Sequence, residues 1–99
     1  MLNITKTMYV KSCIDANKLV IEFFKDNFDG DLFRNYQGYF MVDGKKSGDS
    51  TVKLFVTKGR KDRRISFSSW KKFVSIGDTI ELAKDSRQRI IVKVIKEED

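Results

Sequence analysis

The chain has 99 residues, 40% hydrophobic and 34% charged, and its formal net charge is +6. This length suits one domain with one core, and the apolar fraction with eight phenylalanines argues against disorder. One cysteine and no histidine exclude an internal disulfide, a zinc finger and a histidine-based catalytic dyad.

The N-terminal part of the chain predicts two strands followed by a helix. Residues 4–11 (ITKTMYVK) alternate loosely and predict a strand, and the apolar residues 19–21 predict a second. From Ile21 the apolar positions fall three and four residues apart, at Phe24 and Phe28. That spacing predicts a short amphipathic helix of roughly two turns.

Turn residues separate the next predicted strands. Residues 29–31 (DGD) end the helix, and residues 37–42 (QGYFMV) predict a strand that finishes at the turn residues 43–44 (DG). Residues 51–56 (TVKLFV) predict the clearest strand of the chain. A basic connection at 58–62 follows.

The C-terminal part predicts three further strands and one helical turn. Residues 64–68 alternate as a strand, and Ser68 or Ser69 is expected to cap a one-turn helix containing Trp70. A turn at 76–78 leads into a strand at 79–82, and residues 89–95 (RIIVKVI) predict the last strand. Residues 96–99 are expected to form an acidic, solvated tail.

These elements predict one domain spanning residues 1–99 and mainly β in class. Six or seven short strands at even spacing, with two short helices, indicate an antiparallel pseudobarrel. The expected core residues are Ile21, Phe24, Phe28, Phe55, Phe67, Trp70, Phe73, Ile80 and Ile91.

Positive charge is concentrated in the stretch 45–72. It contains ten lysines and arginines and two aspartates, a net +8 that exceeds the +6 of the whole chain. The densest part, 58–64 (KGRKDRR), lies between two predicted strands. Cations held together on a folded sheet are typical of a surface that binds a polyanion, most often nucleic acid.

Other candidate sites are weaker. Tyr36 and Tyr39 show the least core-like pattern of the aromatic residues, so they are the candidates for stacking on bases. The aspartates near residues 26–31 and Asp43, which precedes Gly44-Lys45, are the candidates for a magnesium-dependent nuclease. An ordinary hairpin turn explains the second pattern equally well, so we expect no metal, no cofactor and no catalysis.

Three segments in order resemble the B3-type DNA-binding pseudobarrel. Residues 18–28 (KLVIEFFKDNF) are similar to that family's strand running into a short helix. Residues 69–74 (SWKKFV) are similar to its tryptophan-containing helix, and residues 76–82 (IGDTIEL) to its Gly-Asp turn and following strand. Residues 66–82 also resemble swapped-hairpin bacterial transcription factors, which implies DNA binding as an obligate dimer.

The B3-type resemblance implies that two loops grip the major groove. By position these are residues 11–18, termed the first contact segment, and residues 57–64, termed the second contact segment. The second coincides with the densest basic stretch, which the charge distribution identifies independently.

We therefore expect a non-catalytic domain that binds nucleic acid, with duplex DNA as the first expectation and RNA left open. The expected contact residues are Lys58, Arg60, Lys61, Arg63 and Arg64 in the second segment, Lys11, Ser12, Asn17 and Lys18 in the first, and Lys71 and Lys72 as phosphate contacts. The alternative is a small interaction or inhibitor module whose basic face docks an acidic protein. Without a signal-peptide pattern or membrane-length apolar run, cytoplasm or nucleus is the expected location.

Overall fold

The structure, a computed structural model, describes residues 2–28, 35–56 and 63–97. Within these ranges the chain is mainly β, as predicted, with seven strands and three short helices. The elements are β1 (Leu2–Asn3), α1 (Lys6–Lys11), β2 (Cys13–Asp15), α2 (Lys18–Phe28), β3 (Asn35–Val42), β4 (Lys45–Val56), β5 (Arg63–Phe67), α3 (Trp70–Phe73), β6 (Thr79–Lys84) and β7 (Ile90–Ile95).

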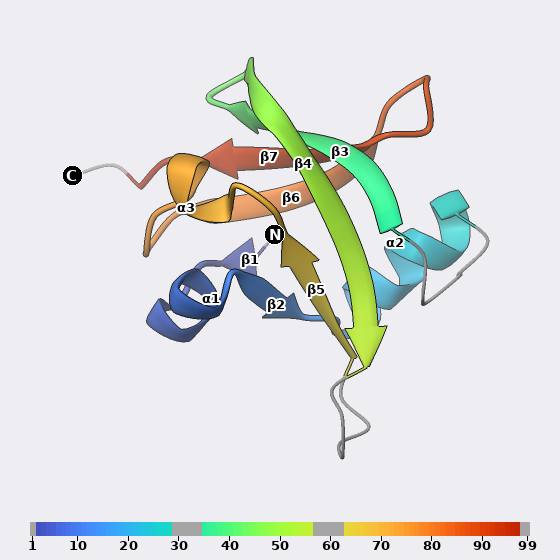
Figure 1. The fold of residues 1–99 in the computed structure, drawn as a ribbon, viewed down its shortest axis with the longest axis horizontal. Coiled ribbons are helices and arrows are strands. Elements are labelled where there is room, and N and C mark those ends of the chain that lie inside the picture. The colour runs from blue at the N-terminus through green and yellow to red at the C-terminus, as the bar shows by residue number, and fades with distance from the viewer. Residues whose placement is uncertain (1, 29–34, 57–62, 98–99) are drawn as a thin grey trace.

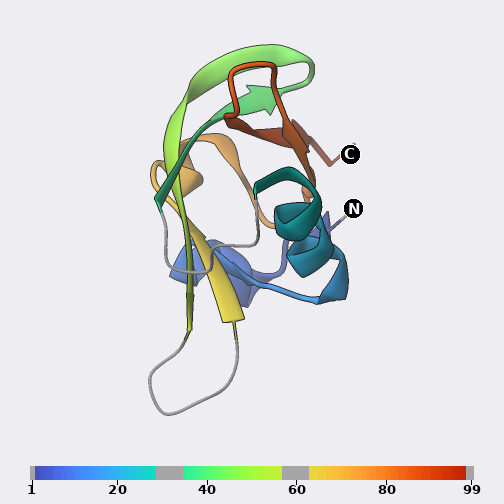
Figure 2. The same cartoon turned by 90° about the vertical axis from the view of Figure 1, so that its right-hand side faces the viewer.

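All seven strands belong to one sheet, which curls into a half-barrel. The strand order is β1-β6-β7-β3-β4-β5-β2, so the two edge strands β1 and β2 are neighbours in the chain and α1 connects them. Helix α2 lies at one end of the half-barrel, and α1 and α3 lie at the other (Figure 1). Figure 2 shows the curl of the sheet and the far ends of β4 and β5 extending from the body.

The sheet is mixed, which corrects the prediction of an antiparallel one. Strand β7 runs antiparallel to β6 but parallel to β3, with Gly38 opposite Ile90 and Val42 opposite Val94. The reason is topological. After β3 the chain passes through β4, β5, α3 and β6 before β7 returns to the other side of β3 in the same direction.

The core fills the concave side of the sheet, where alternate strand residues point inward. At the α2 end, Phe24 and Phe28 pack on Tyr36 with ring centroids 5.1 and 4.9 Å apart. At the α3 end, Trp70 stacks on Phe67 at 4.8 Å. Aromatic clusters thus close both ends of the half-barrel, and burying such side chains stabilises a small domain strongly.

Five of the nine predicted core residues are buried: Phe24, Phe28, Phe67, Trp70 and Ile80. The other four, Ile21, Phe55, Phe73 and Ile91, are half-buried. Phe55 and Ile91 lie on the face of their strands opposite the core, which corrects their prediction as core residues. Because successive residues of a strand alternate, the buried Leu54 and Ile90 leave their neighbours on the convex side.

The prediction of a strand at 4–11 is wrong, because residues 6–11 form α1. The Thr5 hydroxyl accepts a hydrogen bond from the Met8 amide, 3.3 Å away, and Ser12 ends the helix in the left-handed conformation at φ 53°. A side-chain cap at one end and a left-handed residue at the other define a short helix that a loose alternation of apolar residues conceals.

The strand predicted at 19–21 is also helical. Helix α2 begins at Lys18, since the Asn17 side-chain oxygen accepts a hydrogen bond from the Val20 amide at 3.1 Å. Its buried face consists of Val20, Phe24 and Phe28, four residues apart, so the predicted helix exists and is one turn longer.

The remaining elements confirm the prediction closely. The turn at 43–44 has positive φ at both residues, 49° and 84°, as a tight hairpin requires, and β4 extends further back than predicted, to Lys45. The helical turn at Trp70 is confirmed, but the predicted serine cap is not. The Ser68 hydroxyl instead accepts from the Thr51 amide, and Ser69 is left-handed with no capping hydrogen bond in the described structure.

The expected acidic tail is anchored at its start. Lys96 Nζ donates to Asp78 Oδ2 at 2.9 Å and to the Phe73 carbonyl at 2.8 Å, and the Glu97 amide donates to Asp78 Oδ1. Residues 98–99 lie outside the described ranges. The longest of the described helices has 11 residues, and none of them has the length and apolar character of a membrane span.

Candidate nucleic-acid interface

Strands β2, β5 and residues 51–56 of β4 form one flank of the sheet, which we call the wing. Residue pairing sets the side chains of its convex face in rows. Cys13 lies opposite Ser66, which lies opposite Lys53 on the far strand. One step along, Asp15 lies opposite Arg64. The inward residues of the same strands are apolar and buried, so the wing presents its polar side chains to solvent.

Of the second contact segment, the structure describes only the last two residues, Arg63 and Arg64, which begin β5. Lys58, Arg60 and Lys61 lie outside the described residues. Arg63 is exposed, and its carbonyl accepts a hydrogen bond from the Ala16 amide at 2.8 Å. This bond and the β2–β5 pairing place the first contact segment directly beside the β5 end of the second contact segment.

Arg64 is held by the protein itself. Its side chain is 21% exposed, and Nε lies 3.5 Å from Asp15 Oδ1. This Nε is buried and has no hydrogen-bond partner among the described residues. The ion pair is loose, because the Asp15 side chain is 84% exposed and water screens it. Arg64 is therefore a largely covered cation of the wing rather than one that extends into solvent.

The residues of the first contact segment divide into structural and exposed ones. Ser12 ends α1, and its carbonyl accepts from the Phe67 amide at 3.2 Å. Asn17 caps α2 through its side chain. Lys11 and Lys18 are exposed, so they are the members of this segment whose charges face solvent.

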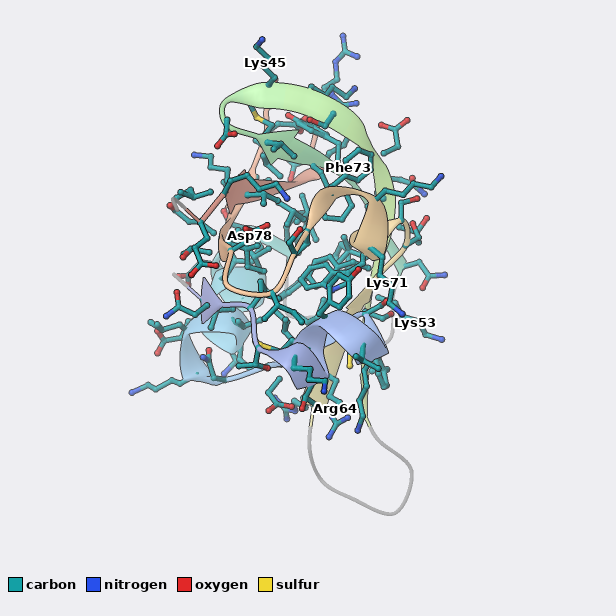
Figure 3. The ribbon with its side chains drawn as sticks, turned by 90° about the vertical axis from the view of Figure 1, so that its left-hand side faces the viewer. Lys45, Lys53, Arg64, Lys71, Phe73 and Asp78 are labelled. Atoms are coloured by element: carbon teal, nitrogen blue, oxygen red, sulfur yellow. The ribbon has the colours of Figure 1, made fainter. Side chains whose placement is uncertain are left out.

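Helix α3 adds two exposed cations, Lys71 and Lys72. Lys71 Nζ lies 5.8 Å from the centroid of the Tyr9 ring on α1, which links the two helices at this end of the molecule. Figure 3 shows Lys71 and Lys53 projecting on the same side, with Arg64 further along the wing. A helix of one turn offers no extended N-terminal anion site, so these residues act through their side-chain charge.

Lys53 and Asp15 were not among the predicted contact residues. The alternation of apolar and polar residues along the strand indicates that Lys53 is exposed. Its neighbours Val52 and Leu54 are apolar, so a lysine between them points outward. The position of Asp15 opposite Arg64 depends on the β2–β5 register, which no local pattern contains.

Charge divides unevenly over the described residues. We call α1, β2, β5, α3 and residues 51–56 the wing side; it carries seven cations and one carboxylate, a net +6. The rest of the described chain carries nine cations and eight carboxylates, a net +1. The wing-side cations are Lys6, Lys11, Lys53, Arg63, Arg64, Lys71 and Lys72.

The prediction that Tyr36 and Tyr39 stack on bases is wrong, because both are buried. Tyr36 belongs to the α2 cluster. Lys46 Nζ and the Arg89 guanidinium make cation–π contacts with the Tyr39 ring, and each lies 4.9 Å from the ring centroid. Burial, with the Asp85 carboxylate nearby, raises the pKa of the Tyr39 hydroxyl. Both rings support the frame of the protein.

Among the described residues, no three carboxylate or cysteine side chains gather as metal ligands. Asp43 occupies the β3–β4 turn, and its amide donates to the Val94 carbonyl. Residues 29–31 of the candidate acidic cluster lie outside the described ranges.

A polar hollow of ≈270 Å³ lies where the two contact segments meet. Its wall consists of Asp15, Ala16, Asn17, Arg63 and Arg64. A groove at the junction of two basic segments suits a phosphate backbone in shape and charge.

Comparison with protein-family models, with curated proteins and with solved structures gives no match for this chain. The geometry and charge of the wing side are therefore the features of the molecule that bear on its function.

Proposed function

We propose that this chain is a non-catalytic nucleic-acid-binding domain that binds duplex DNA through its wing side. The observation that carries the proposal is the uneven distribution of charge. The wing side has seven cations and one carboxylate, while positive and negative charges nearly balance elsewhere in the described chain. Each phosphate that such a surface neutralises releases condensed counterions, which drives binding at low salt.

The adjacency of the two contact segments supports a continuous binding surface. Strand β2 of the first segment pairs with β5, where the second segment ends. The sequence of the second segment adds Lys58, Arg60 and Lys61 next to this junction. Cations contributed by several strands and helices suit a backbone that runs across the wing rather than a single point contact.

Duplex DNA is favoured over a single strand because of where the aromatic rings lie. Single-strand binding without sequence preference depends on exposed rings that stack on bases. Tyr36 and Tyr39 are buried, and the described aromatic clusters belong to the core. In this proposal Lys53 and Lys71 hold phosphates, and Arg63 is the described side chain suited to reach a base edge.

The proposal includes a pseudobarrel of the B3 type. Two of the three resembling segments support it in their local structure, since Trp70 begins a short helix and the turn at 76–78 precedes β6. The third differs, because residues 18–28 are helical from their first residue where the resemblance implies a strand first.

The test is a titration of random duplex and random single strand at two salt concentrations. We expect duplex binding that falls steeply with salt, and a Lys53→Glu/Arg63→Glu double variant that binds about 10- to 100-fold more weakly at low salt. Both residues are exposed, so the free energy of unfolding should change by less than about 0.5 kcal/mol.

The matched control is Lys25→Glu/Arg87→Glu, which makes the same charge change at exposed positions on α2 and in the β6–β7 loop. Equal weakening by both double variants would mean a general attraction to a +6 chain and would contradict a wing-side site. Absence of salt-sensitive binding to any duplex or single strand at low ionic strength would favour the alternative, a basic face that docks an acidic protein.

A further inference from the structure

A second cavity lies in the seam of the half-barrel, where the edge strands β1 and β2 face each other. Its volume is ≈290 Å³, and its wall includes Thr5, Thr7, Lys11, Cys13, Asp15 and Arg64. The first three come from α1 and the residue before it, and the last three from the paired strands β2 and β5. The curl of the sheet creates this cavity, because it brings the two ends of the strand order together.

The charge of the seam cavity is positive. Lys11 and Arg64 contribute two cations, and Asp15 contributes the single carboxylate of the wall. The Asp15 side chain is 84% exposed, whereas the Arg64 side chain is only 21% exposed. Solvent screens the carboxylate more than the guanidinium, so the positive charge is the less screened of the two inside the cavity.

The cavity also has unused hydrogen-bond donors. Arg64 Nε has no hydrogen-bond partner among the described residues, and its ion-pair contact with Asp15 Oδ1 is 3.5 Å long. Among the described residues, neither the Lys11 ammonium nor the Thr7 hydroxyl forms a side-chain hydrogen bond or ion pair. Thr5 differs, because its hydroxyl already accepts from the Met8 amide. Two cations and a free hydroxyl around one cavity form a donor set for an oxyanion.

We infer that the seam cavity binds a phosphate group, held by Lys11, Thr7 and Arg64. The inference deepens the proposed function and rests on it where the phosphate belongs to a nucleic-acid strand. The cavity lies at the low end of volumes known for small-ligand sites, so it admits a phosphate with part of its sugar. The seam cavity shares Asp15 and Arg64 with the hollow between the contact segments. A single nucleic-acid strand can therefore contact both the cavity and the hollow.

The experiment compares Lys11→Gln with Lys6→Gln. Both lysines are exposed on α1 and both changes remove one charge, but Lys6 does not contribute to the cavity wall. One arm measures duplex affinity against salt concentration. We expect Lys11→Gln to reduce the slope of log K against log salt by about 1, and Lys6→Gln, which removes a wing-side cation outside the cavity, to reduce it clearly less.

The second arm titrates inorganic phosphate against chloride at matched ionic strength and follows backbone amide shifts by ¹⁵N NMR. Phosphate-dependent shifts confined to Thr7, Lys11 and Cys13, and reduced in Lys11→Gln, would support a site for free phosphate even without a slope change. A slope change specific to Lys11→Gln would support a site for the nucleic-acid backbone.

The two proposals fail separately. If the wild-type protein binds duplex but Lys11→Gln and Lys6→Gln give equal slopes, and phosphate causes no confined shifts, the seam site is wrong and the proposed function stands. If no variant or wild-type protein binds duplex, the proposed function fails, and the phosphate titration alone decides the seam site. Thermal unfolding of both variants checks that each is folded.

Discussion

Charged side chains on the wing side differ from those around β6 and β7 in how many internal partners they have. Asp78 accepts hydrogen bonds from the Ser75 amide, the Glu97 amide and Lys96 Nζ. Asp15 on the wing has one loose ion pair, and Lys53 has none among the described residues. Charges that hold the fold are internally satisfied, whereas charges left open to solvent remain able to bind a partner.

Asp85 repeats the pattern of Asp78 at the β6–β7 loop. Its carboxylate accepts from the amides of Arg87 and Arg89 and from Arg89 Nε, at 2.8–2.9 Å. Burial alone would raise the pKa of both aspartates, but the hydrogen bonds they accept outweigh it and lower each pKa below the ordinary value. These two carboxylates therefore stabilise turns that connect the strands.

The largest effect expected from this comparison is on stability. Asp78→Ala should lower the free energy of unfolding by about 3 kcal/mol, because it leaves Lys96 and two amides without their acceptor. Asp15→Ala, which removes an exposed carboxylate, should cost less than about 1 kcal/mol. Urea unfolding at neutral pH measures both. Equal losses would contradict the distinction between the two regions.

The pH dependence of stability sharpens the same distinction. The pKa of Asp78 is lower in the folded protein than in the unfolded chain, so the folded state prefers the ionised form. The contribution of Asp78 to stability is fully present above the pKa that it has in the unfolded chain. It is lost as pH falls through the pKa that it has in the folded protein. We expect the free energy of unfolding to decline as pH falls below the ordinary aspartate pKa of 3.8. Asp78→Asn should flatten this decline, and an unchanged profile would contradict the assignment.

The smallest expected effect is on binding. Asp15→Asn removes the one carboxylate of the wing side and should raise duplex affinity about two- to threefold at low salt, by relieving repulsion of phosphate. Asp49→Asn is the matched control, since Asp49 is 85% exposed on β4 outside the wing side. A loss of affinity in Asp15→Asn would show instead that this residue positions Arg64 for the ligand.

Local sequence pattern predicted the elements whose residues alternate cleanly. Val52, Leu54, Ile65 and Phe67 alternate with polar residues, and the strands that contain them were found. Residues 4–11 alternate weakly, and a threonine cap decides their structure, so α1 was missed. The parallel pairing of β3 with β7 brings together residues about 50 positions apart, and no local pattern encodes it.

The candidate site divides in the same way. Composition identified the basic stretch, and alternation contained the signal for Lys53. The burial of Tyr36 by Phe24 and Phe28, the position of Asp15 beside Arg64, and the anchoring of Lys96 by Asp78 all depend on tertiary contacts. Sequence therefore located the charge of the wing side, while the fold determined which side chains share a surface.

The position of β7 in the sheet has a consequence for biosynthesis. This last strand lies between β6 and β3, with pairing on both sides, so the centre of the sheet is incomplete until residues 90–95 have left the ribosome. Strands β3 to β5 can form a meander earlier, but its edge stays open to other chains during that interval. Folding of this sheet should thus wait until residues 90–95 are available, at a rate limited by its distant strand contacts.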